Sequence, residues 1–280
     1  MKLASTYPIR VLCRILDVPR SSVYYRPDVS DTDARFKTAL LDLAGQWPTY
    51  GYRRLTAMMR RLDWTVNAKR VRRCMHELGI AAKPPQRTTR TTDSRHAFPR
   101  FPNLVMDLKI LRPNQLWVAD ITYIRLRREF VYLAVLMDVF TRAIRGWHLG
   151  RSLDQGLTRA ALERALAGAT PEIHHSDQGV QYAAAAYVQR LQKLGVELSM
   201  ATIGEPRENG FAERLIRTIK EEEVYLSDYR DFDDAQTQMA RFLDDVYNVK
   251  RIHSSLGYLT PTEFEQQWHA GRLQATTTST

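Results

Sequence analysis

Hydrophobic and polar positions follow two different periods along the chain. From residue 114 onward, runs of β-branched and aromatic residues separated by short turns favour strands at 115 to 126, 130 to 140 and 143 to 149. Helical and extended patterns then alternate. We expect helices at 154 to 168 and 180 to 194, strands at 172 to 176 and 196 to 200, and later helices after residue 208 and at 232 to 249. An antiparallel meander followed by crossovers predicts an α/β fold, a mixed sheet with flanking helices.

The first 80 residues have helical periodicity instead. A short helix and turn at 8 to 18, followed by a helix start at 19 to 25, form a brief helix-turn-helix pattern. Three longer helical segments follow at 33 to 43, 51 to 61 and 67 to 78, and Gly79 is typical of a C-terminal helix stop. We therefore predict an all-α, helix-turn-helix DNA-binding region at residues 1 to 80.

Charge follows the same division. The formal net charge is +10, with 41 Lys+Arg against 31 Asp+Glu. Residues 1 to 110 hold 21 basic and 9 acidic residues, whereas 111 to 280 hold 20 and 22. A basic N-terminal third suits an arm that neutralises DNA phosphates, and a solvated basic surface is the plainer alternative.

Composition completes the domain plan. Residues 81 to 113 contain several Pro, Thr and Arg residues without sustained periodicity, which predicts a basic linker. The region 114 to 270 is expected to form the core with its C-terminal helices, and 271 to 280 a disordered tail. Membrane-length apolar windows and a signal peptide are absent. Cys13 and Cys74 lack the spacing of a zinc site, so we expect reduced, buried thiols and no structural zinc.

Three carboxylates stand at informative positions in the second region. Asp120 interrupts an apolar strand, where a carboxylate needs a partner or a cation. Asp177 follows the short strand ending at Ser176, and Glu213 begins a helix whose polar face also carries Asn209, Arg217 and Lys220. Spaced carboxylates of this kind suggest a divalent-metal site.

Each carboxylate also has a structural interpretation. Backbone donors can satisfy Asp120, Asp177 can be an ordinary turn residue, and Glu213 can pair with Arg217 at i,i+4. Asp138 also lies in a predicted strand, but the sequence around it matches no catalytic block, so we assign it a structural role. Trp117 and Trp147 are expected in the core.

The segments around these carboxylates together resemble a known family. The blocks are Gln-Leu-Trp-Val-Ala-Asp-Ile-Thr-Tyr-Ile at 115 to 124, His-Ser-Asp-Gln-Gly-Val-Gln-Tyr at 175 to 182 and Glu-Asn-Gly-Phe-Ala-Glu-Arg at 208 to 214. They resemble the Asp, Asp, Glu motif of insertion-sequence transposases, specifically the second-reading-frame (OrfB) type related to retroviral integrases. The resemblance covers almost the whole chain, up to Pro261.

The resemblance implies a ribonuclease H-like core and a DNA transposase, an Asp-Asp-Glu polynucleotidyl transferase. It implies that Asp120, Asp177 and Glu213 are both the catalytic residues and the ligands of Mg²⁺ or Mn²⁺, with two ions bound. The reaction would be metal-dependent DNA strand cleavage and strand transfer, that is, integration and recombination of an insertion sequence.

The implied partner is double-stranded DNA, at the terminal repeats of the element and at the target. The resemblance further implies a homo-oligomer on DNA, action alone or as a fusion with the upstream-frame product, no membrane association, and a bacterial cytoplasmic, nucleoid-associated location. Candidate DNA-binding residues lie on the catalytic helix and on the N-terminal helices: Arg217, Lys220, Arg53, Arg54, Lys69, Arg70, Arg72 and Arg73.

Two other functions are compatible with the same sequence features. A non-catalytic DNA-binding regulator of transposition would bind DNA without metal or Asp177. A host nuclease of the ribonuclease H-like fold would cut structured DNA or hybrids without specific ends.

Overall fold

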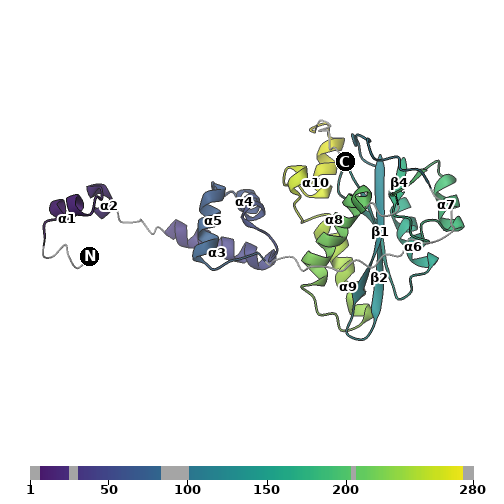
Figure 1. Ribbon diagram of the computed structural model, residues 1–280, viewed down its shortest axis with the longest axis horizontal. Coiled ribbons are helices and arrows are strands. Elements are labelled where there is room, and N and C mark those ends of the chain that lie inside the picture. The colour runs from purple at the N-terminus through teal and green to yellow at the C-terminus, as the bar shows by residue number, and fades with distance from the viewer. Residues whose placement is uncertain (1–6, 25–30, 83–100, 203–205, 274–280) are drawn as a thin grey trace.

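The computed structural model describes residues 7–24, 31–82, 101–202 and 206–273. Most of the predicted linker, at 83–100, and most of the predicted disordered tail, at 274–280, lie outside the described residues. The remaining chain forms two helical groups near the N-terminus and one α/β core (Figure 1). Within the described part, no helix is long and apolar enough to cross a membrane.

The N-terminal helices follow the predicted periodicity. Two short helices, α1 (Ile9–Ile15) and α2 (Arg20–Tyr24), precede α3 (Asp31–Gln46), α4 (Tyr52–Arg61) and α5 (Ala68–Glu77). The last three share a small hydrophobic core that includes Phe36, Leu55 and Cys74. Helix α5 begins at the N-cap Asn67, whose side chain accepts a hydrogen bond from the backbone N–H of Arg70 at 2.8 Å.

Two smaller predictions about this region are confirmed. Gly79 follows α5 with a φ of +66°, the left-handed conformation that favours glycine after a helix. Cys13 and Cys74 are both buried free thiols.

The core sheet has five strands: β1 (Leu116–Arg125), β2 (Phe130–Asp138), β3 (Ile144–Gly150), β4 (Ile173–Ser176) and β5 (Glu197–Met200). Their order is β3-β2-β1-β4-β5. Strands β1, β2 and β3 pair antiparallel, β4 pairs parallel with β1, and β5 pairs parallel with β4. The predicted meander and mixed, ribonuclease H-like sheet are thus confirmed.

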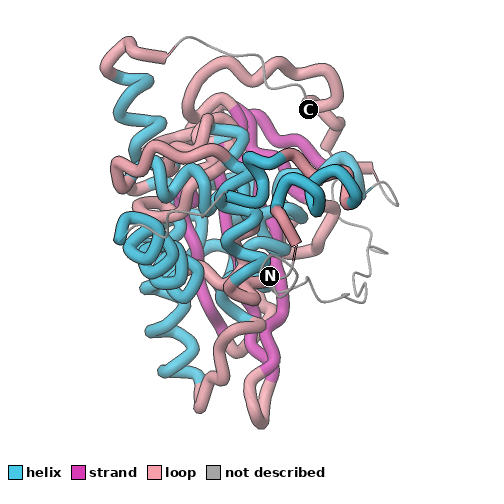
Figure 2. Tube along the Cα trace, turned by 90° about the vertical axis from the view of Figure 1, so that its left-hand side faces the viewer, coloured by secondary structure: helices cyan, strands magenta, loops and turns pink. Residues whose placement is uncertain are grey.

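Helices cover both faces of this sheet (Figure 1). Helices α6 (Gln155–Leu166) and α7 (Ala185–Gln192) pack on one face, where Trp117 and Ala119 point. The other face, with Val118, receives α8 (Gly210–Ile219) and α9 (Phe232–Ala240). Seen from the side of the N-terminal helices, helices lie in front of the long strands (Figure 2). Because β1 alternates between the two cores, it is the central element that fixes Asp120.

The helix on β3 packs unusually close at one glycine. A Cβ built on Gly146 would lie 2.2 Å from the carbonyl oxygen of Ala161 in α6, so a side chain there would force the helix away. Helix α7 begins five residues later than we predicted, at Ala185, because residues 179 to 182 form a turn after β4.

The C-terminal part of the core continues past α8 and α9. A π-helical stretch at Lys220–Val224 extends α8, another at Arg241–Tyr247 extends α9, and α10 (Pro261–His269) follows. Two 3-10 helices, Pro206–Asn209 and Ser254–Leu256, lie in the connections. The predicted helix at 232 to 249 is therefore present, with π-helical geometry in its second half.

Several residues predicted to be structural are so. Asp138 is fully buried, and its oxygens accept hydrogen bonds from the backbone N–H groups of Asn114 and Phe140 and from the guanidinium of Arg145, at 2.8 to 2.9 Å. Trp117 and Trp147 are buried in the two cores.

The three-helix unit α3 to α5 contacts the core through the segment after α9. Ile252 is buried in the hydrophobic core of that unit, and its backbone N–H donates to the hydroxyl of Tyr50 at 3.3 Å. Arg61 forms an ion pair with Glu263 of α10. These contacts fix the helical unit beside α8.

Candidate active site

The first two candidate carboxylates come together because of the register of two parallel strands. Ala119 of β1 pairs with Ser176 of β4, and β4 ends there. The next residues, Asp120 and Asp177, therefore leave the paired region at neighbouring positions on the same edge. Beyond this pair β4 no longer pairs with β1, although β1 continues beside β2.

Asp120 is partly buried and electrostatically coupled to the other two carboxylates. Burial and the negative charges of Asp177 and Glu213 together raise its pKa to about 8, with burial the largest cause. Its Oδ1 accepts a hydrogen bond from the backbone N–H of Ile121 at 2.7 Å, and this bond and the charge of Lys220 act in the opposite direction. An ionised Asp120 is therefore short of compensating positive charge.

Asp177 sits in a tight turn with Gly179. Its Oδ1 accepts from the backbone N–H of Gly179 at 3.0 Å, and a Cβ on Gly179 would lie 2.9 Å from that same oxygen. Gln181 is buried beyond the turn and donates from Nε2 to the carbonyl of Leu153 at 3.2 Å. The backbone N–H of Gly179 therefore orients the Asp177 carboxylate.

His175 links the strand before Asp177 to the segment that leads into α8. Its Nδ1 lies 2.8 Å from the hydroxyl of Ser199 in β5, and its Nε2 lies 3.1 Å from the carbonyl oxygen of Glu208. Burial lowers the His175 pKa to about 4, so the ring is neutral at physiological pH. The local sequence does not reveal this link to Glu208, because the two residues are far apart along the chain.

Glu213 is brought to this edge by the anchoring of α8. Asn209, at the helix N-cap, is buried and donates from Nδ2 to the carbonyl oxygen of Ala119 at 3.3 Å. Leu215 and Ile219 pack into the core on the opposite side of the helix. Glu213 is left exposed in the first turn, where the helix dipole favours a carboxylate.

Two basic residues follow Glu213 along the helix. Arg217 is exposed, whereas Lys220 is partly buried with its Nζ 4.7 Å from the centre of the Tyr123 ring. Burial lowers the Lys220 pKa, and the charge of Asp120 opposes that change. Lys220 therefore contributes positive potential to the carboxylate edge.

The oxygen-only donor set of the edge is the kind that Mg²⁺ prefers. The uncompensated charge of Asp120 fits a cation as well. In the described part of the chain, however, no three His, Cys, Asp or Glu side chains lie close enough together to form a ready metal cluster.

The six basic residues predicted on the N-terminal helices do not share one environment. Arg54 is paired with Glu222 at 2.8 Å, and Arg70 is paired with Asp33 at 3.0 Å. Arg73 is exposed and lies 3.4 Å from Glu77, which is also exposed. Arg53, Lys69 and Arg72 are exposed too.

Glu222 forms an ion-pair joint that the sequence did not reveal. Its carboxylate meets Arg54 of α4 at 2.8 Å and Arg251 at 2.7 Å, and its side chain is only 7% exposed. Although burial opposes ionisation, the two arginines lower the Glu222 pKa. We call Glu222, Arg54 and Arg251 the interdomain joint. Acidic runs such as 221 to 223 are usually solvated, so this pairing has no local sequence signal.

Comparison with known proteins agrees with the arrangement of the core and the helical unit. Residues 111–206 and 194–261 each match the family description of an integrase core domain, and residues 34–88 match an HTH-like domain.

Curated relatives match along most of their length. The transposase for insertion sequence element IS904 of Lactococcus lactis subsp. lactis (strain IL1403) is 32% identical over 221 residues, which cover 78% of this chain and 87% of the relative. The transposase for insertion sequence element IS629 of Shigella sonnei is 30% identical over 282 residues, covering 96% and 95%. Among solved structures, the HTLV-2 integrase catalytic core domain in complex with magnesium is 17% identical, with a TM-score of 0.44, covering 58% of this chain and 99% of that one.

Proposed function

The chain belongs to the insertion-sequence transposases with an integrase core, and on this premise we propose that it catalyses metal-dependent cleavage and strand transfer of DNA. The substrates are the terminal repeats of its own element and a target duplex. Asp120, Asp177 and Glu213 hold Mg²⁺ or Mn²⁺, with two ions bound.

When bound, the ions supply an activated water or hydroxyl for attack and compensate charge at the phosphorus. The chain supplies the position of the carboxylates. Asp120 lies on a strand buried between two cores, and Asp177 is oriented by its turn. Glu213 is placed by the hydrogen bond from Asn209 to β1. Rigid placement matters because in-line attack depends on geometry.

Basic residues on the same helix hold the DNA end. Lys220 lies near Asp120, and Arg217 is exposed three residues before it. The helical unit adds contacts to the duplex through Arg53, Lys69 and Arg72, which are exposed. The active species is a homo-oligomer on DNA, formed by this chain alone or by its fusion with the upstream-frame product.

The observation that carries the proposal is the register of β1 and β4. Because Ala119 pairs with Ser176, the two aspartates that follow them stand at adjacent positions. The charges of Asp177 and Glu213 both act on Asp120, which supports a shared site.

Strand cleavage and joining test this proposal directly. Labelled duplexes bearing the terminal repeats are incubated with wild type or Asp177→Asn in Mg²⁺ or EDTA, with Glu172→Gln as a control for loss of an exposed carboxylate. We expect joining by wild type and by Glu172→Gln in Mg²⁺, and none in EDTA or with Asp177→Asn. End binding without joining by the wild type would favour the non-catalytic regulator instead.

A further inference from the structure

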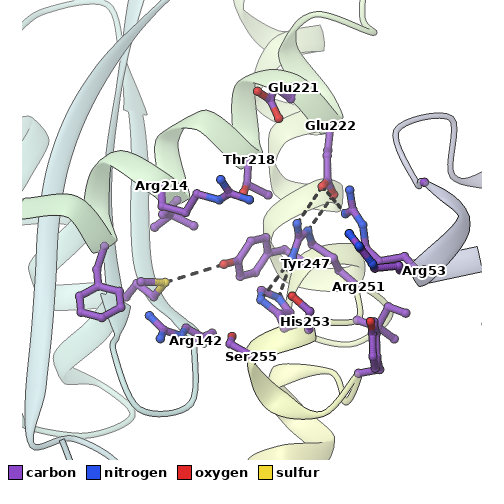
Figure 3. A pocket seen from close by; sticks show the side chains of 18 of the residues that line it. Arg53, Arg142, Arg214, Thr218, Glu221, Glu222, Tyr247, Arg251, His253 and Ser255 are labelled. Carbon is purple, nitrogen blue, oxygen red and sulfur yellow. Dashed lines mark hydrogen bonds and ion pairs between the residues drawn. The ribbon is translucent and has the colours of Figure 1, made fainter. Parts of the chain in front are cut away.

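A second candidate site, lined by arginines, lies on the other side of the catalytic helix. A cavity of about 530 Å³ opens between α4 of the helical unit, α8, the turn after β2 and the segment 251 to 258 (Figure 3). Its wall contains five arginines and two glutamates. His253 also lines it and is neutral, because burial and Arg251 lower its pKa. The cavity is therefore positively charged.

The charges in this cavity fall into two groups. Arg54 and Arg251 are matched to Glu222 in the interdomain joint. Among the described residues, Arg53, Arg142 and Arg214 form no ion pair within 4.0 Å, although Glu221 also lies on the wall. Three guanidinium groups thus remain available to an anion.

Arg142 is held toward the cavity at a conformational cost. It has a φ of +62°, in the left-handed region. Glycine adopts this region readily, and asparagine and aspartate do so sometimes, but other residues rarely do. Its guanidinium lies 4.3 Å from the centre of the Phe211 ring, and the residue lines the same cavity as Arg214. Strained residues of this kind persist where the surrounding structure enforces them, and they are concentrated at ligand sites.

The rest of the wall suits phosphate oxygens. Thr218 and Ser255 carry hydroxyl groups beside the arginines (Figure 3). Planar guanidinium groups bind phosphate oxygens through paired N–H donors, and hydroxyl groups add further donors. The cavity also borders exposed Arg53 on α4, so an extended anion can contact the core and the helical unit together.

We propose that this cavity binds consecutive phosphates of a DNA strand beside the active site, a proposal that rests on the proposed transposase function. Glu213 and Arg214 are successive residues of α8, so their side chains leave the helix about 100° apart. The two sites therefore face different sides of one helix and are separated by at most about its diameter, roughly 10 Å.

The salt dependence of DNA binding tests the proposal. Binding of a labelled terminal-repeat duplex is measured by fluorescence anisotropy across NaCl concentrations, in a Glu213→Gln background that removes turnover. The test variant combines Arg53→Ala with Arg214→Ala, two exposed side chains on the wall. The matched control combines Arg128→Ala with Arg159→Ala, two exposed arginines away from the cavity.

We expect the test variant to reduce the slope of log K against log [NaCl] by about 1.8, because each lost phosphate contact removes about 0.9. The control pair should keep the wild-type slope. Equal slopes for test and control variants, both folded by thermal melting, would overturn the assignment of the cavity.

Two further readouts separate the possible outcomes. Strand joining by the otherwise wild-type protein is measured in parallel and reports on the proposed function. If joining occurs but the test variant keeps the wild-type slope of log K against log [NaCl], the cavity proposal is overturned and the proposed function is not. Calorimetric titration with pyrophosphate distinguishes a small-anion site. Pyrophosphate binding that the test variant loses, together with an unchanged DNA slope, would assign the cavity to a free phosphate ligand and overturn the DNA assignment.

Discussion

Asp120 and Glu222 are both desolvated carboxylates, yet their surroundings drive them in opposite directions. Burial, together with its acidic neighbours, raises the pKa of Asp120 to about 8. The pKa of Glu222 is lowered, because Arg251 and Arg54 outweigh its burial. A buried carboxylate that meets two guanidinium groups stays ionised and joins parts of the molecule. One that meets other carboxylates needs a proton or a cation.

This difference in surroundings indicates a structural role for Glu222 and a chemical role for Asp120. The joint has its positive charges built in, at 2.7 and 2.8 Å. At Asp120 the opposing charge of Lys220 is outweighed by burial and by the charges of Asp177 and Glu213, so an ionised Asp120 lacks compensating positive charge. Mutations at the two places should therefore affect different properties.

The largest expected effect is on catalysis. Glu213→Gln should reduce strand transfer on the order of a thousandfold, because metal ions contribute several kcal/mol of transition-state stabilisation and each tenfold corresponds to about 1.4 kcal/mol. Glu213 is exposed, so the free energy of unfolding should change by less than about 0.5 kcal/mol. Single-turnover joining and urea unfolding measure the two quantities. A large loss of stability in this variant would assign Glu213 a structural role.

In the interdomain joint, by contrast, we expect a substitution to cause a large loss of stability. Glu222→Gln leaves Arg251, whose side chain is 10% exposed, without its counter-charge. We expect a loss of about 3 to 5 kcal/mol in the free energy of unfolding, the usual cost of breaking a buried pair.

The exposed pair of Arg112 and Glu172, at 2.7 Å, provides the control for this measurement. Glu172→Gln should cost less than about 1 kcal/mol, because solvent screens an exposed pair. Urea unfolding of both variants gives the comparison. Equal losses would mean that the joint behaves as a surface ion pair.

A third buried group, His174, makes the free energy of unfolding depend on pH. Burial lowers the pKa of His174 to about 3, its ring lies 2.9 Å from the hydroxyl of Tyr187, and Tyr182 and His175 flank it. The unfolded chain binds this proton below about pH 6.5, whereas the folded chain does not. The stability contribution is thus fully present above pH 6.5 and is lost as the pH falls toward 3.

His174→Phe should therefore flatten the pH dependence of the free energy of unfolding between pH 6.5 and 5. The expected reduction in slope is at most about 1.4 kcal/mol per pH unit. Urea unfolding at several pH values measures it. An unchanged slope would show that His174 is protonated in the folded protein.

The sequence predicted the elements of the core well, because each depends on local periodicity. Strands β1 to β3 and the turn after Ser176 follow from alternating apolar residues and from glycine. The motifs singled out Asp120, Asp177 and Glu213 together, and the register of β1 and β4 explains why the two aspartates are neighbours.

Interactions between distant segments could not be predicted in this way. Arg54 and Glu222 are 168 residues apart, and the predicted role of Arg54 in DNA binding came from the charge pattern of a helix alone. The same limit applies to Arg142, whose left-handed backbone has no local sequence signal. Long-range pairing depends on packing, which the periodicity of one segment does not encode.

Direct measurement of metal binding tests whether Asp120, whose pKa burial and its acidic neighbours raise, belongs to a cation site. Mn²⁺ binding is followed by electron paramagnetic resonance for wild type, Asp120→Asn and the exposed-carboxylate control Glu172→Gln. We expect two bound ions per chain in wild type and in Glu172→Gln, and loss of binding in Asp120→Asn. Unchanged Mn²⁺ binding by Asp120→Asn would contradict this expectation.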